Sequence, residues 1–89
     1  MVRRIVGQSM SPTLNAGDIV IGYRWRRTHG TNTVVIAVMD REVIKRIHAV
    51  TLGGITLLGD NPNFSTDSRQ KGLVQPGSIR AIVIWPRNL

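Results

Sequence analysis

The sequence contains no cysteine, which excludes disulfide bonds, thiolate metal sites and a cysteine nucleophile. A cysteine-free chain suits a reducing compartment, so we expect a cytoplasmic location. The longest apolar run, Val34–Met39, is far shorter than the roughly 20 residues that cross a bilayer. The amino end also lacks the apolar core of a secretion signal. We therefore expect a soluble protein with no membrane anchor in this chain.

Acidic residues are scarce: five Asp and Glu stand against twelve Lys and Arg, for a net charge of +7. Such a charge fits nucleic acid, an anionic membrane surface or an acidic protein partner. The basic residues are dispersed except for Arg24, Arg26 and Arg27 around Trp25. This group supports one alternative, a small basic β-domain that contacts phosphates and stacks a base. One tryptophan among three arginines is weak support, so we expect no nucleic-acid partner.

A chain of 89 residues, 42% apolar and 19% charged, fits a single domain over residues 1–89 with a thin core. No stretch keeps a 3.6-residue apolar period, although one helical turn could form at 11–15 or 68–71. Instead, β-branched runs alternate with Gly, Pro, Asn and Asp, a pattern typical of strands joined by turns. The sequence predicts an all-β fold with strands at 17–23, 33–39, 42–50, 55–58 and 79–85.

Two of these predicted strands carry more information. The strand at 33–39 is too apolar for an exposed edge, so we expect it at the centre of a sheet. In the strand at 42–50, alternation places Lys45 between Val43 and Ile47 on one face. Burial disfavours the charged form of an amine and lowers its pKa. Lys45 could therefore be a neutral amine that takes a proton from a hydroxyl group.

Other catalytic groups are few. His29 falls in a predicted loop, and His48 falls on the strand face opposite Lys45. A Ser/His/Asp triad is hard to assemble from these positions. No pair of His, Asp or Glu has the spacing of metal ligands. We expect neither a metal ion nor another cofactor.

Three clusters stand out, Gly7–Leu14 (GQSMSPTL), Ile44–Ile47 (IKRI) and Gly59–Arg69 (GDNPNFSTDSR). In order and spacing they resemble the boxes of the type I signal peptidases, Ser/Lys endopeptidases related to the self-cleaving LexA-type repressors. The resemblance covers nearly the whole chain and implies a twisted fold of several β-sheets. The third cluster, with a later Trp-Pro pair, is most similar to the soluble proteases that remove the leader of nickel-type superoxide dismutase.

The resemblance also implies roles for individual residues. Ser9 corresponds to the nucleophile and Lys45 to its general base. Ser65 corresponds to a hydroxyl that hydrogen-bonds the lysine amine. Asp67 corresponds to an acid that pairs with the arginine after the base, here Arg46. In the same cluster, two further charged residues resemble ones that fix the loop, namely Asp60 and Arg69.

One position departs from the family pattern. Some relatives stabilise the oxyanion with a serine two residues before the nucleophile, where this chain has Gly7. We expect the backbone N–H of Ser9 to be one oxyanion donor, and the second donor stays open. The resemblance implies an extended precursor or leader peptide bound as an added strand, with small side chains before the cut. Met10 and the strand Val34–Met39 are candidates to line its pockets.

Two other functions remain as alternatives. The chain could be the catalytic part of a signal peptidase that cuts Ala-x-Ala signal peptides. It could also be an inactive relative that only binds peptides, although the presence of both Ser9 and Lys45 disfavours this. The sequence leaves the substrate and the oligomeric state open.

Overall fold

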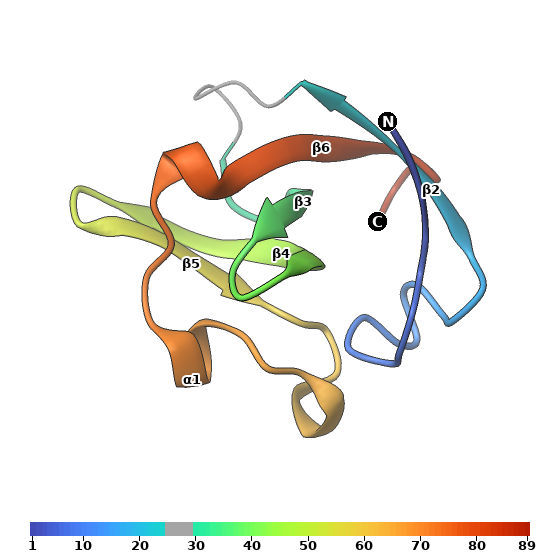
Figure 1. Cartoon of the computed structure of the whole chain (residues 1–89), viewed down its shortest axis with the longest axis horizontal. Helices are drawn as coiled ribbons and strands as arrows, with labels where there is room; N and C mark the ends of the chain where they lie inside the picture. The colour runs from blue at the N-terminus through green and yellow to red at the C-terminus, as the bar shows by residue number, and fades with distance from the viewer. Residues whose placement is uncertain (25–29) are drawn as a thin grey trace.

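The computed structural model describes residues 1–24 and 30–89, and strands form most of its regular structure (Figure 1). Trp25, Arg26, Arg27 and His29 of the sequence analysis lie outside the described residues. The all-β class is confirmed. The strands are β1 (Val2–Arg4), β2 (Ile19–Arg24), β3 (Val34–Val38), β4 (Glu42–Thr51), β5 (Gly54–Leu58) and β6 (Ile79–Trp85). Three short helical segments join them, η1 (Pro62–Phe64), α1 (Ser68–Lys71) and η2 (Pro76–Ser78).

The strands form one six-stranded antiparallel sheet in the order β1-β2-β6-β3-β4-β5. We expected more than one sheet, and this expectation was wrong. The last strand, β6, pairs with β2 on one side and β3 on the other, so it joins both ends of the chain into one sheet. Both ladders of β6 contain a register shift. Such bulges increase local twist, which lets a single sheet wrap around the core.

The central position predicted for the apolar run is confirmed by β3, which lies between β6 and β4. Its residues face two cores: Val35 and Ala37 pack in one hydrophobic cluster, and Val34 packs in the other. The first cluster includes Ile47 and Leu57 from β4 and β5. Because both faces of β3 are covered, neither face favours polar residues. This explains why the run is continuously apolar instead of alternating.

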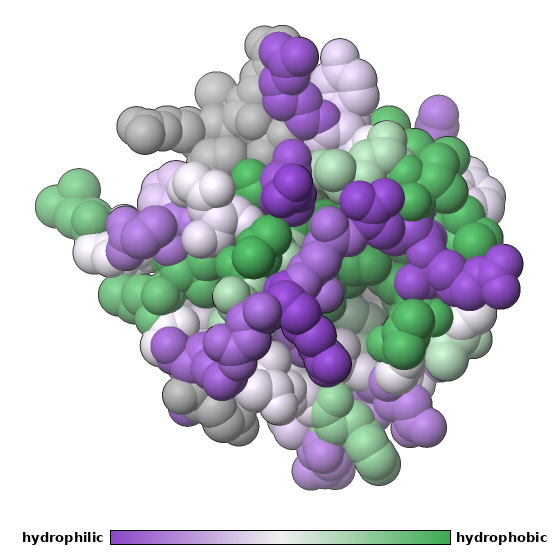
Figure 2. Space-filling view, viewed as in Figure 1, coloured by the Kyte–Doolittle hydropathy of each residue, from purple (hydrophilic) through white to green (hydrophobic). Residues whose placement is uncertain are grey.

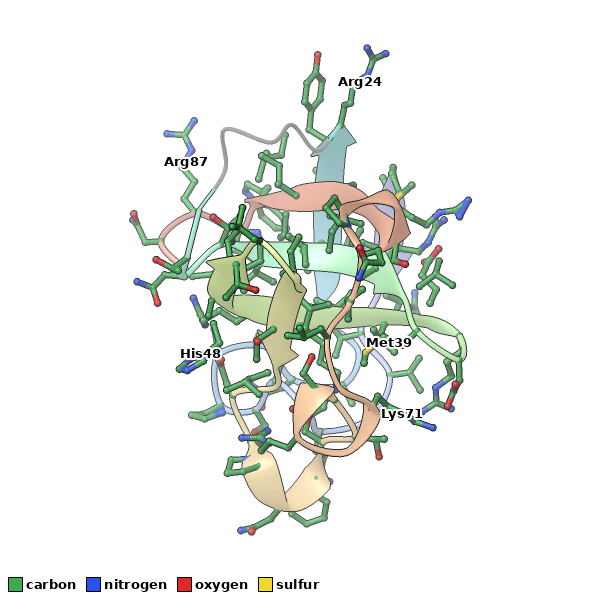
Figure 3. All side chains as sticks on the ribbon, turned by 90° about the vertical axis from the view of Figure 1, so that its left-hand side faces the viewer. Arg24, Met39, His48, Lys71 and Arg87 are labelled. Carbon is green, nitrogen blue, oxygen red and sulfur yellow. The ribbon has the colours of Figure 1, made fainter. Side chains whose placement is uncertain are left out.

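Local predictions differ in their outcome. Strand β6 and helix α1 have the expected residues, but 11–15 forms turns rather than helix. Strand β1 was not predicted, because three residues are too few to show an alternating pattern. His48 is exposed, and Figure 3 shows it on the side of the molecule away from Met39 and Lys71.

The segment between β1 and β2 is held against the second core. Its three buried side chains, Ile5, Met10 and Leu14, are at most 6% exposed and pack with Val20. The Ile5 N–H donates to the Asp18 carbonyl at 2.8 Å, and the Gly17 N–H donates to the Ile5 carbonyl at 2.9 Å. These contacts close the segment into a loop with a fixed base, and Ser9 lies within it.

Part of the sheet surface carries exposed apolar side chains. Val2, Ile21 and Trp85 are register partners on β1, β2 and β6, and their residues are 58%, 37% and 51% exposed. Figure 2 shows apolar residues gathered on the side where β2 lies, bordered by hydrophilic ones. These side chains are therefore partly open to solvent.

A core substitution tests the two-sided packing. Ile47→Ala removes a side chain that is 0% exposed, so we expect the free energy of unfolding to fall by about 2–5 kcal/mol. Val50→Ala on the same strand, at 53% exposure, is the control and should change stability by about 0.5 kcal/mol or less. Urea denaturation followed by circular dichroism measures both. Equal losses would contradict the placement of Ile47 in the core.

Candidate active site

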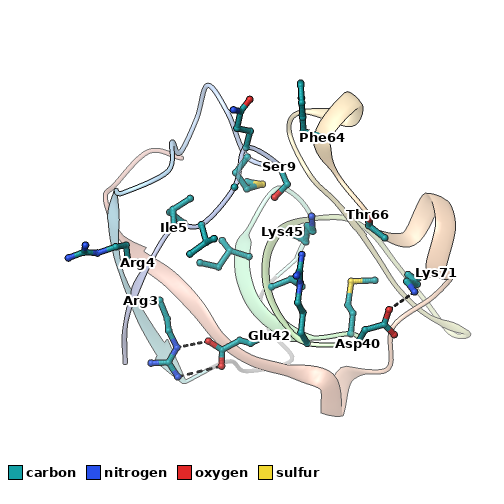
Figure 4. Close-up of a pocket in the computed structure, with 18 residues that line it drawn as sticks. Arg3, Arg4, Ile5, Ser9, Asp40, Glu42, Lys45, Phe64, Thr66 and Lys71 are labelled. Atoms are coloured by element: carbon teal, nitrogen blue, oxygen red, sulfur yellow. Dashed lines mark hydrogen bonds and ion pairs between the residues drawn. The ribbon is translucent and has the colours of Figure 1, made fainter.

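A cleft of about 640 Å³ lies between segment 3–10, the β3–β4 hairpin at 39–45 and the loop that leads into α1. Ser9 and Lys45 both line it. Figure 4 shows their side chains turned toward one another inside the cleft. The cleft therefore brings together two groups that are 36 residues apart in the sequence.

Lys45 is a charged residue in an apolar position. It lies opposite Val35 in the β3–β4 ladder, is 3% exposed, and donates a hydrogen bond to the Ser65 hydroxyl at 2.8 Å. Burial lowers the pKa of Lys45 below its usual value, and the positive charges of Arg69 and Arg41 lower it further, while Asp67 opposes the shift. The amine is thus held closer to its neutral form than an exposed lysine is.

The Ser65 hydroxyl connects Lys45 to a buried carboxylate. It donates to Asp67 Oδ2 at 2.7 Å, and Asp67 is 0% exposed. Burial alone would raise the pKa of Asp67, but hydrogen bonds from Ser65, the Gly59 N–H and Arg69 outweigh it and keep this pKa below its usual value. Asp67 is therefore ionised and can only accept.

This fixes the direction of the hydrogen bonds. Because the single Ser65 proton points to Asp67, Ser65 can only accept from Lys45. A neutral Lys45 amine then gives one N–H to Ser65 and keeps its lone pair available. The expected contact between Ser65 and the lysine amine is present in the structure.

The Ser9 backbone is fixed by the loop after β5. The Ser9 carbonyl accepts a hydrogen bond from the Asn61 N–H at 2.8 Å. A Cβ atom added at Gly59 would lie 2.6 Å from the Ser9 carbonyl oxygen and 2.2 Å from Ser65 Oγ. A side chain at position 59 would therefore push apart the loops that carry Ser9 and Ser65.

The partner expected for Arg46 was wrong. Its guanidinium binds Asp60, with Nε to Oδ1 at 2.9 Å and Nη2 to Oδ2 at 2.8 Å, rather than Asp67. Lys45 and Arg46 point to opposite faces of β4, and Asp67 lies on the face of Lys45. Asp67 instead pairs with Arg69, so the loop-fixing roles expected for Asp60 and Arg69 agree with their contacts.

The candidate pocket residues are mostly buried. Met10 forms part of the cleft wall but is 1% exposed, and its sulfur accepts from the Asp60 N–H at 3.4 Å. Of the strand Val34–Met39, residues 34–37 are buried, and Met39 reaches the cleft. Met10 supports the Ser9 loop, and its contact with substrate stays a prediction.

Two residues that help to position the site were not predicted from the sequence. Thr13 donates its hydroxyl proton to Asp60 at 2.6 Å, so it ties the Ser9 loop to the Arg46–Asp60 pair. Gly59 is the second, because its lack of a side chain lets three segments meet. Both fall inside the motif clusters, but nothing in their spacing indicates a tertiary contact.

Within residues 1–24 and 30–89, no three side chains of the kind that ligate metals come together. In the same residues, no helix is long and apolar enough to span a membrane. The chemistry available in the cleft is that of a hydroxyl beside a buried amine.

An all-β chain with a serine and a buried lysine in one cleft has the form of a serine peptidase of the LexA and signal peptidase type. A family model described as Peptidase S24-like matches residues 1–81. The chain belongs to this family of serine peptidases, as the resemblance in the sequence implied. A comparison with curated proteins gave no match.

Gly59 offers a test of how tightly the site is packed. We expect Gly59→Ala to lower the free energy of unfolding by about 1–3 kcal/mol because the new methyl group overlaps Ser65 and the Ser9 carbonyl. Gly77→Ala is the control, since a Cβ atom there meets nothing within 4 Å. Thermal unfolding of both variants gives the comparison. An unchanged Gly59→Ala protein would show that the two loops are not in contact.

Proposed function

We propose that this chain is a Ser/Lys endopeptidase that removes an N-terminal leader from a precursor protein, with Ser9 as nucleophile and Lys45 as general base. The observation that carries this proposal is the burial of Lys45 in the cleft that also holds Ser9. A serine hydroxyl needs an adjacent base, and an amine with a lowered pKa supplies one.

The proposed reaction uses each group in turn. Ser9 Oγ attacks the carbonyl carbon of the scissile peptide bond while its proton passes to the lone pair of Lys45. Lys45 then gives this proton to the leaving amine, and an ester on Ser9 remains. A water molecule that loses its proton to Lys45 attacks the ester and releases the acid. Lys45 finally returns the proton to Ser9.

Developing negative charge on the substrate oxygen requires hydrogen-bond donors. The N–H groups of Gly7, Gln8 and Ser9 donate to no acceptor within the part of the chain that the structure describes. Gly7 has a φ of +81°, which a residue with a side chain rarely adopts. We assign the Ser9 N–H as one oxyanion donor, and the Gln8 N–H is the neighbouring candidate.

An extended peptide fits the two walls of the cleft. The first half of β4, Glu42–Lys45, pairs with β3 along one edge. Strand β5 pairs with the other edge of β4 only from Arg46 onward, so that edge of Glu42–Lys45 is not paired with β5. On the other wall, the N–H groups at 6–8 are also unpaired among the described residues. A substrate strand between these walls would satisfy backbone groups on both sides.

The precursor of nickel-type superoxide dismutase is the substrate that we propose, on the resemblance of the Gly59–Arg69 cluster. We propose a cytoplasmic site of action, with which a cysteine-free chain is compatible. A signal peptide with an Ala-x-Ala end is the competing substrate and belongs in the same experiment.

Cleavage assays on both substrates test the dyad. Ser9→Ala and Lys45→Met should each lower the cleavage rate by at least about 10²–10⁴-fold. Ser78→Ala removes a hydroxyl outside the cleft and should cleave as the native chain does. Mass spectrometry across pH 6 to 10 identifies the products. Equal cleavage by all four proteins would refute the dyad, and cleavage of the signal peptide alone would replace the proposed substrate.

The pH dependence follows from the direction of the Lys45 shift. Protonated Lys45 cannot accept the Ser9 proton, so activity should rise with pH and reach half its maximum below 10.5, the usual lysine pKa. The same shift means that the folded chain binds fewer protons than the unfolded chain between the two pKa values, so stability should also rise with pH there. A half-maximum at or above 10.5 would contradict the role of burial.

Asp67→Asn tests the direction of the hydrogen bonds. An amide does not hold the Ser65 proton as a carboxylate does, so Ser65 can donate to the Lys45 lone pair and block it. We expect the maximal rate to fall by about tenfold or more. Because Asp67 raises the Lys45 pKa, its removal should also move the rise of activity with pH to lower pH. Ser65→Ala leaves the lone pair open and should retain more activity than Asp67→Asn. Unfolding curves of both variants separate loss of fold from loss of base.

A further inference from the structure

The rim of the cleft carries acidic and basic side chains that are mostly paired with each other. Glu42 pairs with Arg3, and Arg80 Nε lies 3.9 Å from its Oε2 atom. Asp40 pairs with Lys71, which connects the β3–β4 hairpin to α1 (Figure 4). Both carboxylates among the cleft residues are therefore already neutralised within the chain.

Arg41 lies between these two carboxylates in the sequence and also lines the cleft. It is exposed and has no ion pair among the described residues. Arg4 is the other cleft arginine without an ion pair, but Figure 4 shows it directed away from the cleft. Among the described cleft residues, Arg41 is thus the arginine whose guanidinium is available to pair with a carboxylate of a bound molecule.

Arg41 lies close to the place where the peptide bond would be cut. Arg41 directly precedes β4 and lines the same cleft as Val43 and Lys45. The four residue steps from Arg41 to Lys45 span at most roughly 13 Å. The charge of Arg41 also contributes to lowering the Lys45 pKa, so it acts on the same cleft. A peptide strand along Glu42–Lys45 would bring a residue within about four positions of the scissile bond next to Arg41.

A bound peptide that covers this guanidinium excludes water from it. An arginine that loses water without a partner costs free energy, whereas a carboxylate can restore two charge-assisted hydrogen bonds. The nearby Asp40 and Glu42 are occupied by Lys71 and Arg3. We infer, on the basis of the proposed function, that the substrate carries an Asp or Glu within about four residues of the scissile bond and that Arg41 binds it.

Peptide binding tests this inference separately from cleavage. Ser9→Ala protein is titrated with Ala-rich peptides that carry one Glu or one Gln at each position from five residues before to five after the cut. Glu at one position should bind roughly two- to fivefold more tightly than Gln there, and 0.5 M NaCl should reduce the ratio. Arg41→Gln in the same background should abolish it.

Arg87→Gln is the matched control, because it removes the same charge at a place outside the cleft. Arg87 lines a separate hollow near the carboxyl end, and Figure 3 shows it on the opposite side from Met39 and Lys71. This variant should keep the Glu preference. A preference that Arg87→Gln also loses would indicate attraction by net charge and overturn the assignment to Arg41.

The remaining outcomes distinguish the two proposals. Equal binding of all Glu and Gln peptides, or no saturable binding by any of them, overturns the Arg41 inference. Cleavage of the neutral peptides by native protein without a Glu preference also overturns it and leaves the proposed function in place. A Glu preference in binding, with no cleavage of these peptides, of the dismutase precursor or of the signal peptide by native protein, overturns the proposed function instead.

Discussion

The buried Lys45 amine is the group on which the arrangement of the site depends. An amine that is 3% exposed needs partners in place of water, and its described side-chain partner is Ser65, 20 residues further along the chain. Asp67 determines which way the Ser65 proton points. Through Ser65, the carboxylate thereby controls the availability of the Lys45 lone pair.

The same loop is attached to β4 on both of its faces. Lys45 binds Ser65 on one face, and the next residue, Arg46, binds Asp60 on the other. Because neighbouring strand residues point to opposite sides, the Lys-Arg pair holds the loop from both. Thr13 and the Asn61 contact with Ser9 extend this attachment to the nucleophile, so the base and the hydroxyl are positioned by one shared structure.

Features that depend on neighbouring residues could be predicted. The apolar run of β3 indicated a central strand, and alternation placed Lys45 between Val43 and Ile47. The prediction failed where long-range pairing decides, as in the joining of all strands into one sheet through β6. The pairing of β6 with both β2 and β3 joins them, with a register shift in each ladder, and no pattern within a single strand reveals this pairing.

The sequence by itself determined the strands other than β1, the apolar face around Lys45 and the residue types at the site, because alternation and turn chemistry act over a few residues. Only the tertiary structure decided that Arg46 binds Asp60 rather than Asp67, that Gly59 must lack a side chain, and that Arg41 has no ion pair among the described residues. Each of these depends on the distance between segments that are remote in sequence. That distance is set by how the sheet twists and how the loops pack across it.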